Sequence, residues 1–132
     1  MTIFSKIVAG EIPCYKVAED EKYFAFLDIN PMTKGHTLVI PKAENDYVFD
    51  LDDETLSGLF IFAKRVALAI EKSIDCRRVG IMTIGLEVPH THVHLIPFTH
   101  ESEMNITNKK LQLNKEEMLD IASKIRENFL VH

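Results

Sequence analysis

Residues 89–97 read PHTHVHLIP, and three of the chain's six histidines lie there two residues apart, as His90, His92 and His94. Side chains at positions i, i+2 and i+4 of a β-strand point to the same face of a sheet. A strand over 90–98 is therefore expected to present a row of three imidazoles. Such a row can bind a metal ion or handle a phosphate group, and the row by itself leaves both hypotheses open.

Size, charge and cysteine usage limit the class of protein. With 132 residues, of which 46% are hydrophobic, we expect one domain over 1–132. The net charge of −5 gives no basic surface for a nucleic-acid polymer, whereas a single nucleotide needs only a few local donors. Cys14 and Cys76 are isolated, which suits a reducing compartment. We see neither a leader nor a run of about 18 apolar residues, so we expect a cytoplasmic protein without membrane contact.

The remaining chain predicts an α+β fold with an antiparallel sheet. Short apolar segments bounded by Gly, Pro and Asp-Ile-Asn-Pro turns predict strands over 15–18, 23–29, 36–40, 79–85 and 90–98. Apolar residues at three- and four-residue steps predict a long helix ending near Ser73 and a C-terminal helix capped by Asn114 and Glu117. A short helix is expected over 3–10, closed by Gly10, and 99–113 is interpreted as a loop.

The metal and phosphate hypotheses require different neighbouring groups around the histidines. A three-histidine metal site commonly needs a further ligand, for which His36 and Glu87 are candidates without a diagnostic spacing. For phosphate chemistry, a neutral imidazole is a competent nucleophile, and neighbouring imidazoles can donate hydrogen bonds to the phosphate oxygens. Their pKa of about 6.5 also allows acid catalysis at neutral pH. One strand face would thus supply the nucleophile and the donors together.

Several segments together resemble one known family. Residues 90–96 have the form His-φ-His-φ-His-φ-φ, where φ is apolar, which is similar to the signature of the histidine triad (HIT) superfamily. The other segments that resemble the family are IVAGEIP at 7–13, FLDINP at 26–31 and GHTLVIPK at 35–42. The resemblance covers about residues 3–98 and leaves a C-terminal loop and helix, 99–132, outside it.

The resemblance implies a fold and a reaction. The implied HIT-like fold has a five-stranded antiparallel sheet, one long central helix and a C-terminal helix, and forms a homodimer whose sheets join. The implied ligand is a nucleoside phosphate, usually a purine nucleotide, which reacts at its α-phosphate through a covalent nucleotidyl-histidine. By position, His92 corresponds to the nucleophile. His90 and His94 would orient it and contact the phosphate or the leaving group, and His36 matches the family's fourth histidine.

The resemblance also implies a set of nucleotide-binding residues, namely Asp28, Ile29, Phe4, Ile7, Phe26, Gly85 and Glu87. A carboxylate at Asp28 can accept hydrogen bonds from both ribose hydroxyls. The apolar members are implied to flank the base. Simpler interpretations stay open: Asp28 can begin an Asx turn, His36 can lie at a strand end, and the aromatic residues can belong to the core.

The chain departs from the family in two places. Many relatives form a zinc site from a C-x-x-C motif and a histidine after Ile-Pro-Lys; Ser5 and Glu44 stand here instead, so we predict no structural metal and no cofactor. Relatives usually carry Gly-Gln-x-Val before the triad, whereas residues 85–88 read GLEV. The Glu87 carboxylate would repel a polyphosphate tail or hold a basic leaving group.

These departures favour one reaction among three. We expect a nucleoside phosphoramidase-like hydrolase that releases an amine or ammonia from a nucleoside 5′-phosphoramidate. The enzyme alternative is a dinucleoside polyphosphate hydrolase. An alternative from another class is a nucleotide-binding regulator with little activity.

Overall fold

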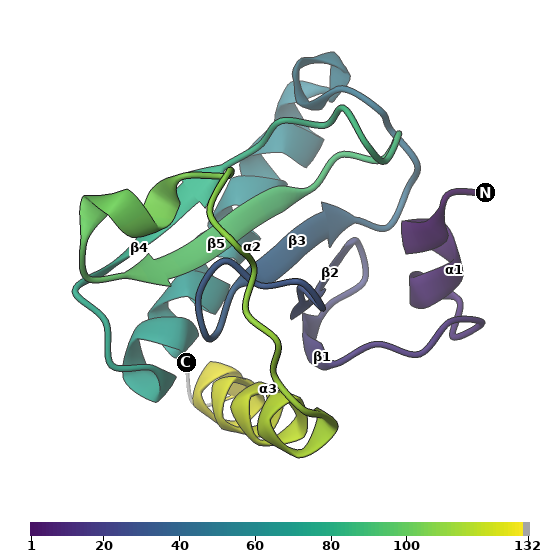
Figure 1. Cartoon of the computed structure of the whole chain (residues 1–132). Helices are drawn as coiled ribbons and strands as arrows, with labels where there is room; N and C mark the ends of the chain where they lie inside the picture. Colours follow the sequence, from purple (N-terminus) through teal and green to yellow (C-terminus); the bar gives the residue numbers. More distant parts are fainter. Residues whose placement is uncertain (131–132) are drawn as a thin grey trace.

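A five-stranded antiparallel sheet forms the centre of the computed structural model, which describes residues 1–130 (Figure 1). The strands are β1 (Lys16–Glu19), β2 (Tyr23–Leu27), β3 (Thr37–Pro41), β4 (Arg78–Met82) and β5 (Val93–Phe98). Their spatial order is β1-β2-β3-β5-β4, and each neighbouring pair is antiparallel. The α+β fold and the five-stranded antiparallel sheet expected from the sequence are confirmed.

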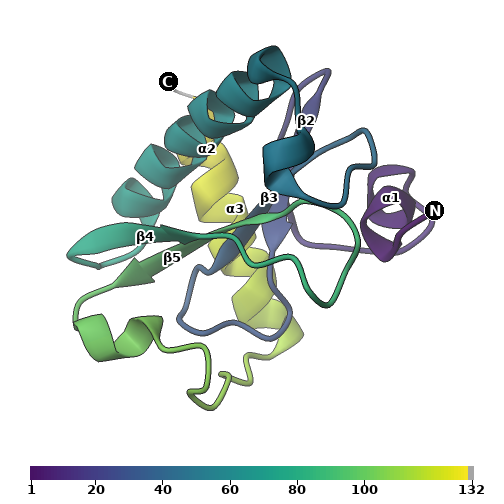
Figure 2. The ribbon, with the colours of Figure 1, turned by 90° about the horizontal axis from the view of Figure 1, so that it is seen from above.

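Helices α2 (Asp53–Ser73) and α3 (Lys115–Leu130) pack against each other and cover one face of the sheet (Figures 1 and 2). The Asp52 side chain caps α2 by accepting a hydrogen bond from the Thr55 amide at 2.7 Å. The predicted capping box of α3 is present, since Asn114 Oδ1 accepts from the Glu117 amide at 2.8 Å. The main core lies between these helices and the sheet.

The short helix α1 (Ile3–Val8) lies near the opposite face of the sheet (Figure 2). Strand alternation explains why both faces of β2 are buried: Tyr23, Ala25 and Leu27 point into the main core, whereas Phe24 and Phe26 point to the other side. A second core cluster forms there from Phe4, Ile7, Phe24, Phe26, Leu38 and Ile40. Gly10 follows α1 with φ +81°, a conformation that suits glycine at a helix end.

The strand predicted over 90–98 begins later than expected. In the structure β5 starts at Val93, which pairs with Val39, so His90 and His92 precede the strand. The pairing cannot continue regularly because Pro41 has no amide hydrogen and its carbonyl oxygen receives the His90 side chain instead. The expected row of three histidines on one strand is therefore wrong, and only His94 lies in β5.

Smaller differences concern the other boundaries. The predicted strands over 23–29 and 79–85 end at Leu27 and Met82, and the predicted loop over 99–113 contains a 3₁₀ helix, η2 (Glu101–Met104). A second 3₁₀ helix, η1 (Val48–Asp50), precedes α2. Within residues 1–130, no helix combines the length and the apolar composition needed to cross a membrane.

Candidate active site

Four histidines gather on the sheet face that α2 and α3 leave uncovered. His94 lies on β5 opposite Leu38, whose side chain belongs to the second core cluster, and His36 immediately precedes β3. The His94 ring centroid lies 5.0 Å from that of His92 and 5.1 Å from that of His36. The structure thus brings the predicted catalytic histidines together, although only His94 lies within a strand.

A backbone carbonyl determines which nitrogen of His92 carries the proton. His92 Nδ1 lies 2.8 Å from the backbone oxygen of His90. A carbonyl oxygen can only accept a hydrogen bond, so Nδ1 must carry the hydrogen. In the neutral ring Nε2 then keeps its lone pair, which is the electronic requirement for a nucleophile.

A second chain of hydrogen bonds orders His36 and His94. The Met32 amide donates to His36 Nδ1 at 3.0 Å, so neutral His36 carries its hydrogen on Nε2. That nitrogen lies 2.9 Å from His94 Nδ1, which accepts the bond. Neutral His94 therefore carries its hydrogen on Nε2. The Nε2–H group of His94 is therefore a hydrogen-bond donor on the ring next to His92, and it can stabilise a phosphate oxygen or a leaving group.

Both ring nitrogens of His90 are occupied within the protein. Its Nε2 donates to the Pro41 carbonyl oxygen at 2.8 Å, and its Nδ1 lies 2.8 Å from the Thr2 hydroxyl oxygen. The ring is fully buried. The geometry therefore favours an orienting role for His90 over contact with a phosphate oxygen.

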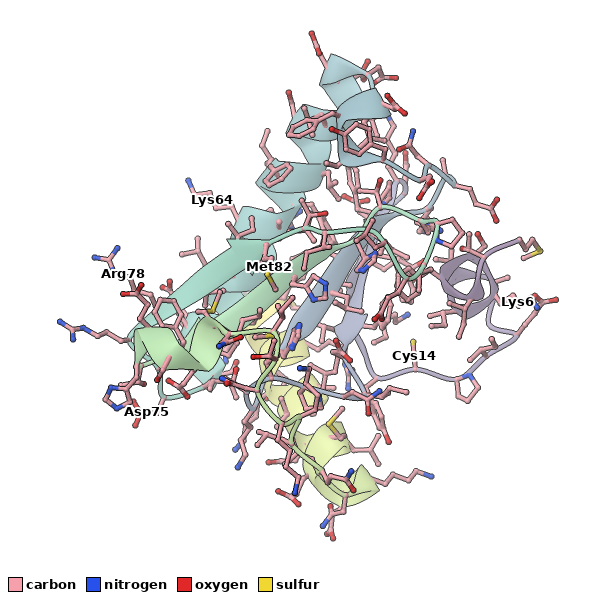
Figure 3. The ribbon with its side chains drawn as sticks, turned by 45° about the horizontal axis from the view of Figure 1, so that its top comes forward. Lys6, Cys14, Lys64, Asp75, Arg78 and Met82 are labelled. Atoms are coloured by element: carbon pink, nitrogen blue, oxygen red, sulfur yellow. The ribbon has the colours of Figure 1, made fainter. Side chains whose placement is uncertain are left out.

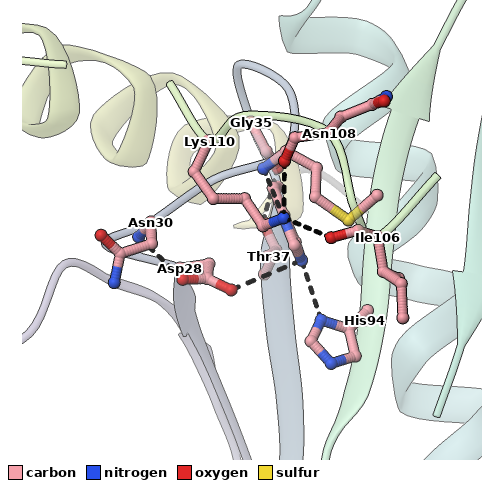
Figure 4. A network of polar contacts seen from close by, with 10 residues as sticks. Asp28, Asn30, Gly35, Thr37, His94, Ile106, Asn108 and Lys110 are labelled. Carbon is pink, nitrogen blue, oxygen red and sulfur yellow. Dashed lines mark hydrogen bonds and ion pairs between the residues drawn. The ribbon is translucent and has the colours of Figure 1, made fainter. Parts of the chain in front are cut away.

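Asp28 forms the Asx turn that the simpler interpretation expected, and it also lies beside the histidines. Its Oδ1 accepts from the Asn30 amide at 2.8 Å, which is an Asx turn, and its Oδ2 lies 3.6 Å from His36 Nε2 (Figure 4). Burial raises the pKa of the Asp28 carboxyl, while the Lys110 ammonium opposes that rise. The carboxyl group therefore lies beside the histidines with one oxygen outside the turn.

Sequence reasoning missed Lys110, which lies in the segment interpreted as a loop. The Leu111 amide donates to the Pro31 carbonyl at 2.9 Å and fixes this segment over the β2–β3 connection. Lys110 Nζ donates to the carbonyl oxygens of Ile106 and Asn108 at 2.6 and 2.9 Å (Figure 4). The Lys110 ammonium therefore lies near Asp28, and no sequence motif predicted this contact.

The residues implied to flank the base have different environments. Phe4, Ile7 and Phe26 are buried in the second core cluster, as the simpler core interpretation expected. The edge-to-face contact of Phe4 with His92, at 5.1 Å between ring centroids, nevertheless brings this cluster to the triad. Ile29, by contrast, is 71% exposed.

The GLEV loop is exposed beside the site. Gly85 adopts φ +77°, a conformation that disfavours other residues, and Leu86 is 89% exposed. The Glu87 carboxylate contributes to the raised pKa of Asp28, after the larger effects of burial and neighbouring groups. Its charge therefore acts on the site although its side chain lies in solvent.

Three residues have ligand atoms close enough to share one cation. Atoms of Asp28, His36 and His94 all lie within 4.8 Å of one another. The sequence suggested His36 for such a site, whereas Glu87 does not belong to this group. A metal bound through His36 Nε2 and His94 Nδ1 would replace the hydrogen bond between them, because both nitrogens would have to offer a lone pair to the ion.

Burial keeps these imidazoles neutral. It lowers the pKa of His36 to about 3, assisted by His94, and lowers the pKa of His94 to about 4, assisted by His92. The pKa of His90 is also lowered by burial. The neutral tautomers of His36, His90 and His94 are thus the ones that exist near neutral pH.

The lowered pKa values predict a pH-dependent stability. Between about pH 6.5 and 4, unfolded histidines bind protons that folded His36 and His94 do not, so the free energy of unfolding falls as the pH falls. We expect each residue to account for roughly 1–2 kcal/mol between pH 7.5 and 5. The raised pKa of Asp28 acts in the opposite sense, at lower pH. Urea denaturation across this range measures the slope.

Two variants identify the origin of that slope. His36→Asn and His94→Asn should each flatten the pH dependence, because each removes one imidazole whose pKa is lowered by burial. Equal slopes for His36→Asn and the unmodified chain would contradict the assignment.

Comparison with known proteins finds relatives along most of the chain. A family model described as HIT domain matches residues 9–101. An uncharacterised HIT-like protein of Borreliella burgdorferi is 38% identical over 135 residues, covering 96% of this chain and 96% of that protein. The adenosine 5′-monophosphoramidase of Schizosaccharomyces pombe is 40% identical over 100 residues, covering 75% of each.

The fold agrees with these sequence matches. A crystal structure of a HIT-like protein involved in cell-cycle regulation from Bartonella henselae superposes with a TM-score of 0.85 at 32% identity, covering 96% of this chain and 95% of that chain. The segment matched by the family model includes Asp28, His36 and all three histidines of the triad. The chain belongs to the HIT domain family, as the resemblance of its histidine motif implied.

Proposed function

We propose that this chain hydrolyses a nucleoside 5′-phosphoramidate, or a related purine nucleotide conjugate, at the α-phosphate. One observation carries the proposal: the His90 carbonyl holds the hydrogen of His92 on Nδ1 and leaves the Nε2 lone pair free. The name of the 40%-identical relative, adenosine 5′-monophosphoramidase, supports the same substrate class.

The reaction proceeds in two displacements. The Nε2 lone pair of His92 attacks the α-phosphorus, and the bond from phosphorus to the leaving nitrogen breaks; that nitrogen takes a proton from solvent and departs as an amine or ammonia. Water then attacks phosphorus, breaks its bond to Nε2 and releases the nucleoside monophosphate. The His90 carbonyl stabilises the positive charge of the nucleotidyl-imidazole, because it accepts from Nδ1 throughout.

The surrounding groups bind and orient the nucleotide. The Nε2 hydrogen of His94 donates to an α-phosphate oxygen, where charge accumulates in the transition state. Asp28 accepts hydrogen bonds from the ribose hydroxyls through the oxygen that its turn leaves free. The second core cluster, which includes Phe4, provides an apolar surface on which the base packs.

His92→Ala tests the nucleophile. We expect turnover of adenosine 5′-phosphoramidate to fall by roughly 10³-fold or more, because removing a nucleophile removes the covalent route. His100→Ala, at an exposed site, is the matched control. Mass spectrometry after quenching with a slow substrate should find a nucleotidyl adduct on His92. Turnover at the normal rate by His92→Ala would refute the proposal, and nucleotide binding without turnover by the unmodified chain would favour the regulator.

Glu87→Gln tests the preference for the leaving group. Removing this carboxylate should raise turnover of a dinucleoside polyphosphate relative to the phosphoramidate by about 3–10-fold, because an exposed charge repels a polyphosphate through partly screened interactions. Glu127→Gln removes an exposed carboxylate of α3 and should leave the ratio unchanged. An unmodified chain that already prefers the polyphosphate would favour the other hydrolase.

We also propose a homodimer that forms through β4 and α2. Strand β4 is at an edge of the sheet and packs against α2; Ile81 of β4 is 53% exposed, and Ile61 and Leu68 of α2 are exposed as well. The charged side chains of Lys64 on α2 and Arg78 on β4 also point outward (Figure 3). Exposed apolar side chains inside a charged rim are typical of an interface.

Sedimentation velocity tests the dimer. We expect the unmodified chain to sediment as a dimer and Ile61→Arg to shift it to a monomer, because the variant buries a charge in the interface. Leu119→Arg is the matched control, since Leu119 is equally apolar and exposed on α3. A monomer at all concentrations for the unmodified chain would contradict the proposal.

A further inference from the structure

A polar network joins the N-terminal residues to the triad. The Thr2 hydroxyl oxygen lies 2.8 Å from His90 Nδ1 and accepts from the Ser5 amide at 3.0 Å. Glu44 Oε1 accepts from the Thr2 amide at 2.9 Å and from the Ser5 hydroxyl. Three segments far apart in the sequence thus meet at one threonine. The family model starts at residue 9, so Thr2 and Ser5 lie outside the segment that it matches.

The direction of each hydrogen bond follows from its partners. His90 Nε2 faces the Pro41 carbonyl and must donate, so Nδ1 of the neutral ring must accept. The Thr2 hydroxyl therefore donates its only hydrogen to His90 Nδ1. Thr2 in turn is held by Glu44 and by the first turn of α1.

The same residues act on His92 through His90. The backbone oxygen of His90 accepts the Nδ1 hydrogen of His92, so fixing the His90 side chain also fixes the carbonyl that selects the His92 tautomer. Phe4, two residues after Thr2, contacts both rings edge-on, at 5.8 Å from His90 and 5.1 Å from His92 between centroids. The N-terminal residues thereby act on His92 in two ways: through the hydrogen bond from Thr2 to His90, and through the ring contacts of Phe4.

We propose that Thr2, held by Glu44 and Ser5, is a positioning residue that keeps His92 in its Nδ1-protonated, nucleophilic form through His90. The proposal rests on the function proposed for His92 and assigns a role to a segment that the histidine motif does not include. Helix capping alone accounts for the bond from the Ser5 amide, but it does not require the bond to His90.

Three substitutions at Thr2 separate positioning from capping. Thr2→Val keeps the shape and loses the hydroxyl, Thr2→Ser keeps the hydroxyl, and Thr2→Asp keeps a good N-cap that cannot donate to His90 as a carboxylate. We expect kcat to fall about tenfold in Thr2→Val and Thr2→Asp, the loss of about one hydrogen bond, with KM changed less than about twofold. Thr2→Ser should restore kcat.

Nuclear magnetic resonance provides a test that needs no substrate. Long-range ¹H–¹⁵N correlations at pH 7.5 should show His92 protonated on Nδ1 in the unmodified chain and in Thr2→Ser, and a mixture of tautomers in Thr2→Val. If no nucleotide is turned over, the proposed function fails, while this spectrum still tests the role of Thr2. An unchanged His92 tautomer in Thr2→Val, or a kcat lost equally in Thr2→Ser, would overturn the proposal.

Discussion

The tautomers of the site histidines are determined by backbone groups, each of which can only donate or only accept a hydrogen bond. The Met32 amide can only donate, and the carbonyls of Pro41 and His90 can only accept. Each therefore places the hydrogen of a neutral imidazole on one nitrogen. Because burial keeps the pKa of His36 and His94 far below neutrality, the assignments for these two rings hold where an exposed histidine would exchange between forms. The different hydrogen positions on similar side chains thus arise from the main chain around them.

The sheet brings these backbone groups together through strand alternation. Tyr23 and Leu27 of β2 point into the main core under α2 and α3, so Phe24 and Phe26 necessarily point to the other face. His94 of β5 lies on this second face, with its pairing partner Leu38. The apolar cluster there excludes water beside the histidines, and this desolvation is the main cause of their lowered pKa values.

The sequence predicted which histidines lie close together, but it predicted little of the environment around them. The two-residue spacing of His90, His92 and His94 identified the family although only His94 is in a strand, because the motif encodes the positions and the irregular path depends on Pro41. Lys110 and Thr2 escaped notice for a common reason. Each reaches the site from a distant segment, as in the contact from Thr2 to His90 across 88 positions, and periodicity carries no information about such pairs.

The N-terminal helix is held by apolar packing and by a few hydrogen bonds, each of which contributes about 1 kcal/mol. A six-residue helix is not stable alone, so α1 must depend on docking, mainly through the buried Phe4 and Ile7. The bonds of Glu44 and Thr2 then add orientation more than stability. In this chain, apolar packing of α1 and the geometry of the triad are therefore directly coupled, because the residues that anchor the helix also contact the histidines.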